Sequence, residues 1–332
     1  MQDKFMKRIK QLIPEERSVI DEIAAILNMS YDAAYRRSTN KATLSLAEAV
    51  KLAKHFKISL NKLYEVGEQN TLLAEKSPTI IDTASLENYF KASLKNMAPL
   101  TKLKDVSIIY SAKDIPIFYT LQDSLITKYK CYVWLKFLNE DGSMSKVSFE
   151  EFLETIPESL LEHARKLSVA YKNINITEFW NDNTINGTLQ QIFYYFESGL
   201  VSKKIALLIC DDIAAIIDHV EQQTIQQTII KSNNNATYHL YKSDLLTMSN
   251  TMMIKTQHQK VFFTPFTVLS YLKIEHSPTC EDLSRFFEKQ KKNSKLLVNA
   301  GEKDRALFFN MLQQKVKTVK KRITLNQDLM FF

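Results

Sequence analysis

The chain has 332 residues, of which 45% are hydrophobic, while glycine (5) and proline (7) are scarce. This length suits two or three domains, and the composition favours a helix-rich folded protein without long flexible linkers. No stretch approaches the roughly 20 apolar residues that cross a bilayer, and the N-terminus carries charges where a signal peptide needs an apolar run, so we expect a cytoplasmic protein with no membrane partner.

The net charge of +7 is unevenly distributed along the chain. Residues 1–70 hold 12 Lys and Arg against 9 Asp and Glu (+3), and residues 289–322 hold 11 against 2 (+9), which leaves −5 for residues 71–288. A basic end suits a polyanion, but exposed lysines also solvate ordinary helices. We therefore interpret the C-terminal lysines as a solvated face, with a second DNA contact as the alternative.

The first part of the chain has a helical spacing of apolar residues. This spacing predicts helices over residues 4–13, 18–27 and 45–56, with a short polar helix between the last two. Pro14 ends the first helix, and Ser30 is a good N-cap residue for the short polar helix that follows it. Asn28 and Met29 fill the gap before Ser30, so two helices meet across a tight turn.

Two of these helices have a pronounced apolar face. In the helix over 18–27 it consists of Val19, Ile20, Ile23, Ala24, Ile26 and Leu27. In the helix over 45–56 it consists of Leu46, Ala49, Val50, Leu52, Ala53 and Phe56. We expect both faces to pack in one small core.

The order and spacing of these helices resemble the lambda-repressor-like (Cro/C1-type) helix-turn-helix family, over residues 1–65 only. The resemblance implies that residues 18–27 form the scaffold helix and that residues 30–38 (SYDAAYRRS) form the recognition helix. It implies that residues 45–56 form a closing helix and that residues 59–64 form a short terminal helix. It also implies a function, the sequence-specific binding of double-stranded DNA by a transcriptional regulator.

The resemblance indicates which side chains face base edges. These positions are Tyr31, Asp32, Ala33 and Arg36. Arg36 suits a bidentate contact to guanine, worth about 1 to 3 kcal/mol of discrimination, and Asp32 suits a bond from cytosine N4. Better placed for phosphates are Tyr35, Arg37 and Lys41, which would supply salt-dependent affinity.

The chain departs from this family at three positions. Ile20 stands where a glutamine often holds a phosphate, and Ser38 and Asn40 stand where a glutamate and a glycine often close the recognition helix. The expected grip on the DNA backbone therefore depends more on Arg36, Arg37, Lys41 and a dimer.

After residue 64 the hydrophobic period breaks, and we place a domain boundary near residues 70–78. We divide the chain into a helix-turn-helix DNA-binding domain, a linker with a connecting helix, and a regulatory or dimerisation domain, which are residues 1–70, 71–104 and 105–332. The connecting helix over 85–97 either joins the domains or pairs with its copy in a dimer.

The rest of the chain mixes strands and helices. Strands are predicted over residues 106–111 and 174–180, and a meander of successive strands over 237–242, 251–255 and 260–263. Helices are predicted within 148–166, over 184–199 with Gly199 as its cap, over 205–220, over 279–291 with a Thr279–Asp282 capping pattern, and over 302–322. The aromatic-rich residues 115–138 fit either helix or strand, and residues 140–143 predict a turn.

These elements define the expected fold class. It is mainly α with a mixed α/β C-terminal domain, in which an N-terminal four- to five-helix module precedes a larger α+β regulatory domain. The phrases SAKDIPIF (residues 111–118) and FFN (residues 308–310) resemble the long regulatory regions behind helix-turn-helix modules in uncharacterised Bacteroidetes regulators. That likeness implies a regulator and names no ligand.

No catalytic or metal-binding motif stands out in the sequence. Six histidines are scattered without metal-ligand spacing, and five glycines leave little for a phosphate-binding loop. Cys131, Cys210 and Cys280 are far apart, so we expect reduced structural thiols. We expect no enzyme, no metal and no cofactor.

Two features leave alternatives open. Asp212 interrupts the apolar stripe of the helix over 205–220, so it needs a lysine, a ligand cation or a partly exposed edge position. The aromatic residues that are dense within 110–196 either fill an ordinary core or line a small-molecule pocket.

Together these observations predict a sequence-specific DNA-binding transcriptional regulator. One recognition helix reads only a few base pairs, so we expect a homodimer that places two such helices about 34 to 36 Å apart. A small-molecule effector is a candidate second partner. The alternative is a protein-interaction scaffold whose helical head does not bind DNA.

Overall fold

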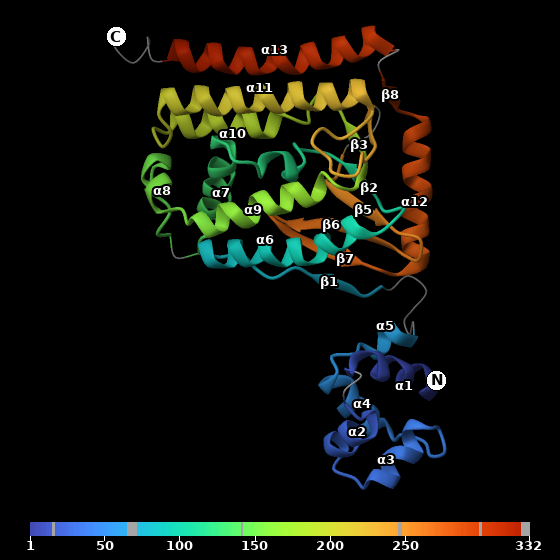
Figure 1. Cartoon of the computed structure of the whole chain (residues 1–332). Coiled ribbons are helices and arrows are strands. Elements are labelled where there is room, and N and C mark those ends of the chain that lie inside the picture. Colours follow the sequence, from blue (N-terminus) through green and yellow to red (C-terminus); the bar gives the residue numbers. More distant parts are fainter. Residues whose placement is uncertain (15–16, 65–71, 141, 245–247, 299–300, 327–332) are drawn as a thin grey trace. The chain divides into compact units, whose positions relative to one another are not determined.

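The computed structural model describes residues 1–14, 17–64, 72–140, 142–244, 248–298 and 301–326 (Figure 1). The chain divides into two compact units, Met1–Leu73 and Ala74–Phe332. Across the described residues the protein combines many helices with one mixed sheet, so it is a mixed α/β protein.

The described part of the first unit is helical. Its helices are α1 (Gln2–Leu12), α2 (Val19–Leu27), α3 (Tyr31–Ser38), α4 (Leu46–His55) and α5 (Leu60–Tyr64). All five lie within two residues of the predicted bounds. Their shared core is small and contains Phe5, Met6, Ile9, Ile23, Ala34, Leu52 and Ala53.

Side-chain caps explain why these helices begin and end where they do. Ser30 accepts a hydrogen bond from the Ala33 backbone at the start of α3, and Ser45 forms a capping box with Glu48 at the start of α4. Helix α2 ends because Asn28 adopts φ 54°, in the left-handed region that asparagine tolerates better than most residues.

One predicted feature of the first unit is wrong in detail. Leu46 and Val50 are 79% and 36% exposed, although they share the predicted apolar face of α4 with the buried Leu52 and Ala53. Leu46 is the first residue of α4, and the small core does not reach it. The apolar spacing therefore overstates how much of α4 is buried.

The second unit is built on an eight-stranded sheet of described strands with the order β1-β7-β6-β5-β2-β3-β4-β8. The strands are β1 (Ala74–Lys76), β2 (Ser107–Ser111), β3 (Asn175–Trp180), β4 (Tyr238–Lys242), β5 (Thr251–Lys255), β6 (Lys260–Thr267), β7 (Ser270–Ile274) and β8 (Lys295–Leu297). Strands β2, β3 and β4 are parallel, and the other pairings are antiparallel.

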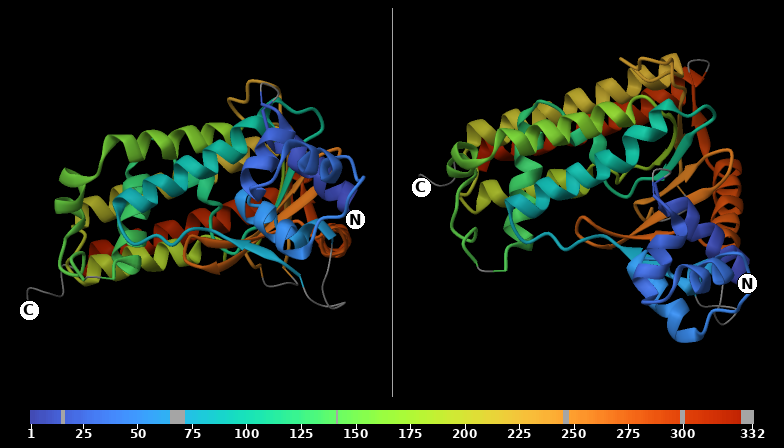
Figure 2. Two further views of the ribbon diagram at one scale, coloured as in Figure 1. Left: turned by 90° about the horizontal axis from the view of Figure 1, so that it is seen from below. Right: turned by 60° about the horizontal axis from the view of Figure 1, so that its bottom comes forward.

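Helices cover both faces of this sheet (Figure 2). They are α6 (Thr83–Met97), η1 (Ala98–Lys102), η2 (Ile117–Thr120), α7 (Leu125–Leu138), α8 (Phe149–Thr155), α9 (Glu158–Tyr171), α10 (Asn186–Glu197), α11 (Lys203–Gln226), α12 (Ser277–Lys292) and α13 (Glu302–Asn326). Ile109 and Phe179 pack against Phe287 of α12 on one face. Ile108 and Tyr110 belong to the large core beneath the other helices, as the two-residue period of a strand requires.

The predicted meander is wrong for its first strand. Strand β4 pairs with β3 and β8, while β5 pairs with β2 and β6, so β4 and β5 are not neighbours. Strands β5, β6 and β7 form the antiparallel meander instead. Successive strands often pair, but here the parallel pairing of β4 with β3 separates it from β5.

The ambiguous residues 115–138 contain η2 and the helix α7. Helix α7 has buried residues on every side, including Ile126, Tyr129, Tyr132 and Leu135, so its sequence shows no one-sided helical period. The predicted turn covers residues 140–143, of which residue 141 lies outside the described residues. Gly142 in this turn has φ 71°.

Helix α12 does not start with the predicted capping pattern. It begins at Ser277 after the N-cap residue His276, and Pro278 occupies its first turn, where proline is favoured. The Thr279 hydroxyl lies 2.8 Å from Nδ1 of His276 and does not cap the helix.

The expected linker and connecting helix, residues 71–104, are largely part of the second unit. Strand β1 pairs with β7, and Leu86 and Phe90 of α6 are fully buried in the large core. This apolar face holds α6 against α9. The unit therefore begins at Ala74 rather than at residue 105.

No helix among the described residues combines the length and apolar character that crossing a bilayer requires. Cys131, Cys210 and Cys280 are free thiols and are buried. Burial raises the pKa of Cys131 to about 12, so that thiol stays protonated at neutral pH.

Candidate DNA-binding surface

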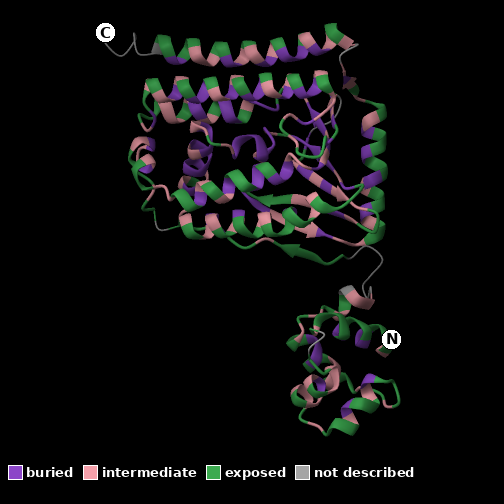
Figure 3. Ribbon diagram, in the orientation of Figure 1, coloured by how far each residue is buried: buried purple, intermediate pink, exposed green. Residues whose placement is uncertain are grey.

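Helix α3 has one buried side and one exposed side (Figure 3). Ala34 and Ser38 face the core, whereas Tyr31 is 52% exposed and Tyr35 is 40% exposed. Two charged residues, Asp32 and Arg36, are exposed as well. Four of the predicted contact residues are thus accessible on one short helix.

Contacts from α1 and the following loop hold the C-terminal end of α3. The Arg36 carbonyl accepts hydrogen bonds from the backbone of Lys41 (2.7 Å) and Ala42 (2.9 Å). Gln2 donates to the carbonyls of Arg37 (2.9 Å) and Ala42 (2.8 Å), and its Oε1 accepts from the Leu44 backbone (2.9 Å). Gln2 therefore fixes the loop after α3 from a distant part of the unit.

Asn40 stands where the resemblance leads one to expect a glycine. Its φ is 59°, in the left-handed region that glycine favours and asparagine tolerates. The chain therefore makes the same turn with a different residue, and the amide of Asn40 adds a hydrogen bond to Asp3 (3.3 Å).

Neighbouring arginines of α3 have different surroundings. Nη2 of Arg37 lies 2.9 Å from Glu48 of α4, and its side chain is 24% exposed. Hydrogen bonding from Arg37 lowers the pKa of Glu48 and keeps it ionised. Arg36 is exposed and has no ion pair with any described residue, so its guanidinium is available to a ligand.

The remaining predicted contacts lie near the C-terminal end of α3. Nζ of Lys41 is 5.4 Å from the centroid of the Tyr35 ring, a cation–π arrangement that orients both side chains. Ala33 is half-buried on the helix. The structure thus gathers Tyr35, Arg36 and Lys41 at the surface, while Arg37 is engaged by α4.

The C-terminal lysines have several partners within the second unit. Lys295 pairs with Asp304, and Lys320 of α13 pairs with Asp211 of α11. Lys315 donates to the Asp182 carbonyl. These contacts agree with a solvated face that also holds helices together, and a second DNA contact stays untested.

The second unit contains a buried acidic group that no sequence motif marks. Glu178 of β3 is fully buried and accepts hydrogen bonds from Tyr171 (2.7 Å), Tyr238 (2.9 Å), Trp180 (2.9 Å) and Tyr119 (3.3 Å). Burial raises the pKa of Glu178 to about 7, although these four donors oppose the shift. The carboxyl group therefore links β3, β4, η2 and α9.

A buried lysine lies beyond the carboxyl ends of β2 and β3. Nζ of Lys130 donates to Thr188 (2.6 Å) and Gln191 (3.2 Å) and lies 3.7 Å from Asp114. Burial lowers the pKa of Lys130, and Asp114 opposes that shift. Lys130 borders a cavity of about 640 Å³, but its own donors are already engaged.

Of the alternatives for Asp212, the structure confirms the partly exposed position. The carboxylate of Asp212 accepts from the Ile126 backbone (2.8 Å) and so caps the first turn of α7. Burial raises the pKa of Asp212, and the hydrogen bonds from that turn oppose the rise. A contact between two distant helices thus explains the polar interruption in α11.

Among the described residues, no group of three or more His, Cys, Asp or Glu side chains is arranged to hold a metal ion. Comparison of the chain with models of protein families, with curated proteins and with solved structures finds no match. The surface of α3 and the cavities of the second unit therefore carry the functional argument.

Proposed function

We propose that the chain is a sequence-specific DNA-binding transcriptional regulator whose helix α3 enters the major groove. The observation that carries the proposal is the exposure of Tyr31, Asp32 and Arg36 on a short helix whose ends are fixed by Ser30 and Gln2. The major groove is about 12 Å wide and admits an α-helix, and Arg36 can pair with guanine there.

Phosphate contacts then come chiefly from Lys41 and Tyr35 at the end of α3. Arg37 is held by Glu48, so it supports α4 against α3 and adds less to the charge that meets the backbone. Residues 1–70 carry a net charge of only +3. Modest charge on a single module favours a homodimer, because two modules double both the phosphate and the base contacts.

The second unit has the size for a dimerisation or sensing role. Its cavities offer room for a small molecule. In this proposal the first unit binds the operator and the second unit controls that binding.

The experiment that tests this proposal is selection of duplexes from a random library with the full chain, followed by binding measurements from 50 to 200 mM salt. We expect one enriched motif with two half-sites, two chains per duplex, and affinity that falls steeply with salt. Absence of an enriched motif, or affinity that does not respond to salt, would overturn the proposal.

One observation favours the alternative, a protein-interaction scaffold. Leu46 is 79% exposed beside the half-exposed Val50 on α4, and an exposed apolar pair suits a protein contact. Such a head would bind its partner with little dependence on salt. In that case the unaltered chain should bind no duplex, and replacing Leu46 with Ser should abolish partner capture; salt-dependent duplex binding that Leu46→Ser leaves unchanged supports DNA binding through α3 instead.

A further inference from the structure

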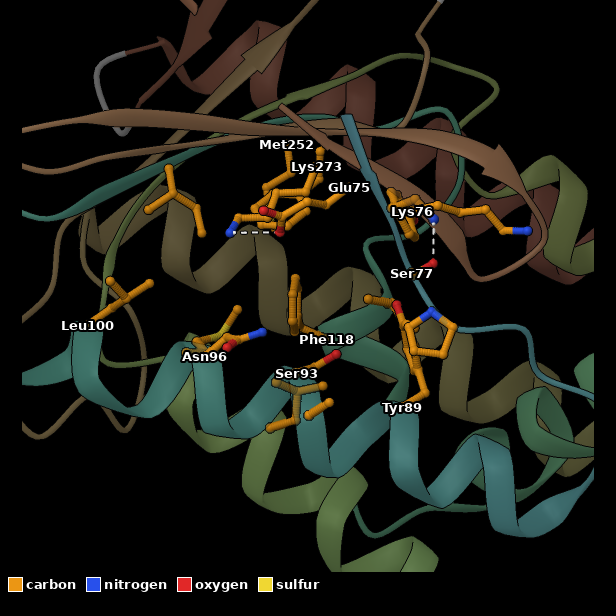
Figure 4. Close-up of a pocket in the computed structure, with 18 of the residues that line it drawn as sticks. Glu75, Lys76, Ser77, Tyr89, Ser93, Asn96, Leu100, Phe118, Met252 and Lys273 are labelled. Carbon is orange, nitrogen blue, oxygen red and sulfur yellow. Dashed lines mark hydrogen bonds and ion pairs between the residues drawn. The ribbon is translucent and has the colours of Figure 1, made fainter. Parts of the chain in front are cut away.

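A cavity of about 290 Å³ lies between α6 and the antiparallel half of the sheet (Figure 4). Residues of β1, β2, β5, β6 and β7 form one wall, and residues of α6, η1, η2 and α9 form the other. This volume is near the lower end of the range for small-molecule sites, about 300 to 1,000 Å³.

Small side chains on α6 create this space. Ala92, Ser93 and Asn96 line the cavity, whereas the large apolar Leu86 and Phe90 of the same helix are buried in the core. Ala92 and Asn96 are themselves exposed, so the cavity opens to solvent beside α6. A ligand can therefore enter it from solvent and bury its apolar surface against the sheet.

The wall is mainly apolar and carries a few hydroxyl groups. Phe118 and Met252 lie across from Ser93 in Figure 4, and Leu167 and Ile254 extend the apolar lining. These side chains favour rings or a short hydrocarbon chain over a highly polar molecule.

The hydroxyl groups face one another in two pairs, Tyr110 with Tyr271 and Tyr89 with Ser93. Burial raises the pKa of all three tyrosines, so their hydroxyls keep their protons at neutral pH. Each pair holds two protons and uses one between its members. Each pair therefore has one proton left for an acceptor on a ligand.

Of the two lysines at the cavity, Lys273 is ion-paired, whereas Lys76 is exposed and lies over an aromatic ring. Nζ of Lys273 lies 2.7 Å from Glu275 and 3.4 Å from Glu75, and Nζ of Lys76 lies 5.6 Å from the centroid of the Phe266 ring. A ligand charge would have to displace one of these partners or stay unpaired, which is costly in an apolar site. The lining thus favours an uncharged ligand.

We propose that this cavity binds an uncharged, mainly apolar molecule of one or two rings that carries a carbonyl oxygen. The carbonyl accepts the spare proton of the Tyr110–Tyr271 pair. Tyr271 is also bonded through its backbone to Ser77, which donates to its carbonyl (2.9 Å) and accepts from its amide (2.9 Å). A ligand on Tyr271 therefore touches the segment that starts the second unit, and its role as an effector rests on the proposed function.

The test uses 6-propionyl-2-(dimethylamino)naphthalene, an uncharged two-ring ketone whose emission shifts to the blue in apolar surroundings. We expect the full chain to bind one molecule with such a shift. Ala92→Phe, which adds a ring to the wall of the cavity, should weaken binding at least tenfold, whereas Ala84→Phe, on the same helix but outside the lining, should not change it. The anionic 8-anilinonaphthalene-1-sulfonate should not compete at this site.

Tyr271→Phe tests the hydrogen bond without changing the volume. It should weaken binding of the ketone roughly twofold to tenfold, as the loss of one hydrogen bond predicts. Tyr241→Phe, on the α12 face of the sheet, is the matched control and should leave binding unchanged. Fluorescence of Trp134 and Trp180, the only tryptophans, verifies that each variant is folded.

Three results would overturn this proposal: no saturable binding of the ketone, equal affinity in Ala92→Phe and the unaltered chain, or competition by the sulfonate. The measurement needs no DNA. If the chain binds the ketone as expected but binds no duplex, the cavity proposal stands and the proposed function is wrong. If the chain binds duplex but not the ketone, the proposed function stands and the cavity proposal is wrong.

Discussion

The two units place their polar side chains in opposite ways. In the first unit, Arg36 and Asp32 stand exposed on a helix over a small core. In the second unit, Glu178 and Lys130 are buried and have their hydrogen bonds satisfied within the fold. Exposed groups on a firmly held helix are free to bind a partner, whereas buried and satisfied groups chiefly fix the arrangement of strands and helices.

The largest expected effect is on the stability of the first unit, and it tests which residues belong to its small core. Leu52→Ala should lower the free energy of unfolding of the first unit by about 2 to 5 kcal/mol, because Leu52 is fully buried. Leu46→Ala, on the same helix, should change it by less than about 0.5 kcal/mol. Hydrogen–deuterium exchange of the α1–α4 amides measures both, and similar losses in the two variants would show that Leu46 belongs to the core.

The next effect concerns the buried carboxyl group of the second unit. The folded-state pKa of Glu178 is about 7, above its ordinary value of 4.5, so the folded chain holds a proton that the unfolded chain releases in this range. Its stabilising effect is full below pH 4.5 and is lost as the pH rises to 7.

Unfolding of the second unit by urea, followed by fluorescence of Trp134 and Trp180, measures this effect. Relative to Glu178→Gln, the free energy of unfolding of the unaltered chain should fall by about 3 kcal/mol between these pH values. His219, whose pKa burial lowers to about 4, titrates in both proteins and cancels in the difference. Parallel pH curves for the two proteins would contradict the raised pKa.

The third prediction concerns Arg36, which is exposed on α3 of the first unit. Arg36→Ala should weaken binding to the selected duplex by about 1 to 3 kcal/mol, since one bidentate contact to guanine is lost. Arg8→Ala removes the same charge from an exposed position on α1 and is the control. Anisotropy titrations at fixed salt measure both, and equal losses in the two variants would mean that Arg36 acts only through its charge.

The smallest expected effect is on the stability of the first unit and distinguishes the role of Arg37 from that of Arg36. Arg37→Ala should lower the free energy of unfolding of the first unit by about 1 kcal/mol, because its partly buried pair with Glu48 is lost. Glu48→Gln should have a similar effect, and the double variant should lose little more than either single one. Additive losses in hydrogen–deuterium exchange would show that the two side chains act independently.

Local chemistry made the helices of the first unit predictable. Ser30 and Ser45 cap helices whose apolar residues recur within a few turns, and all these interactions join residues close in sequence. Of the residues of α3 that we expected to meet DNA, Tyr31, Asp32, Tyr35 and Arg36 are exposed. The apolar pattern overestimated how much of α4 is buried, because a repeat of apolar residues does not indicate how far a core extends.

The sheet was less predictable, because pairing joins distant residues. Strand β1 pairs with β7 across nearly the whole second unit, and nothing near Ala74 or Ile274 in the sequence indicates the other. Helix α7 is buried on all sides, so its period carries no signal. The partners of Glu178 come from four separate elements and could only be found in three dimensions.

The sequence by itself therefore determined the helices of the first unit, the exposed chemistry of α3 and most elements of the second unit, because caps and periodic apolar residues act over a few positions. Tertiary structure alone decided that Gln2 fixes the end of α3, that Arg37 pairs with Glu48, and that small residues on α6 leave a cavity against the sheet. Each of these depends on side chains that are brought together only when distant segments pack.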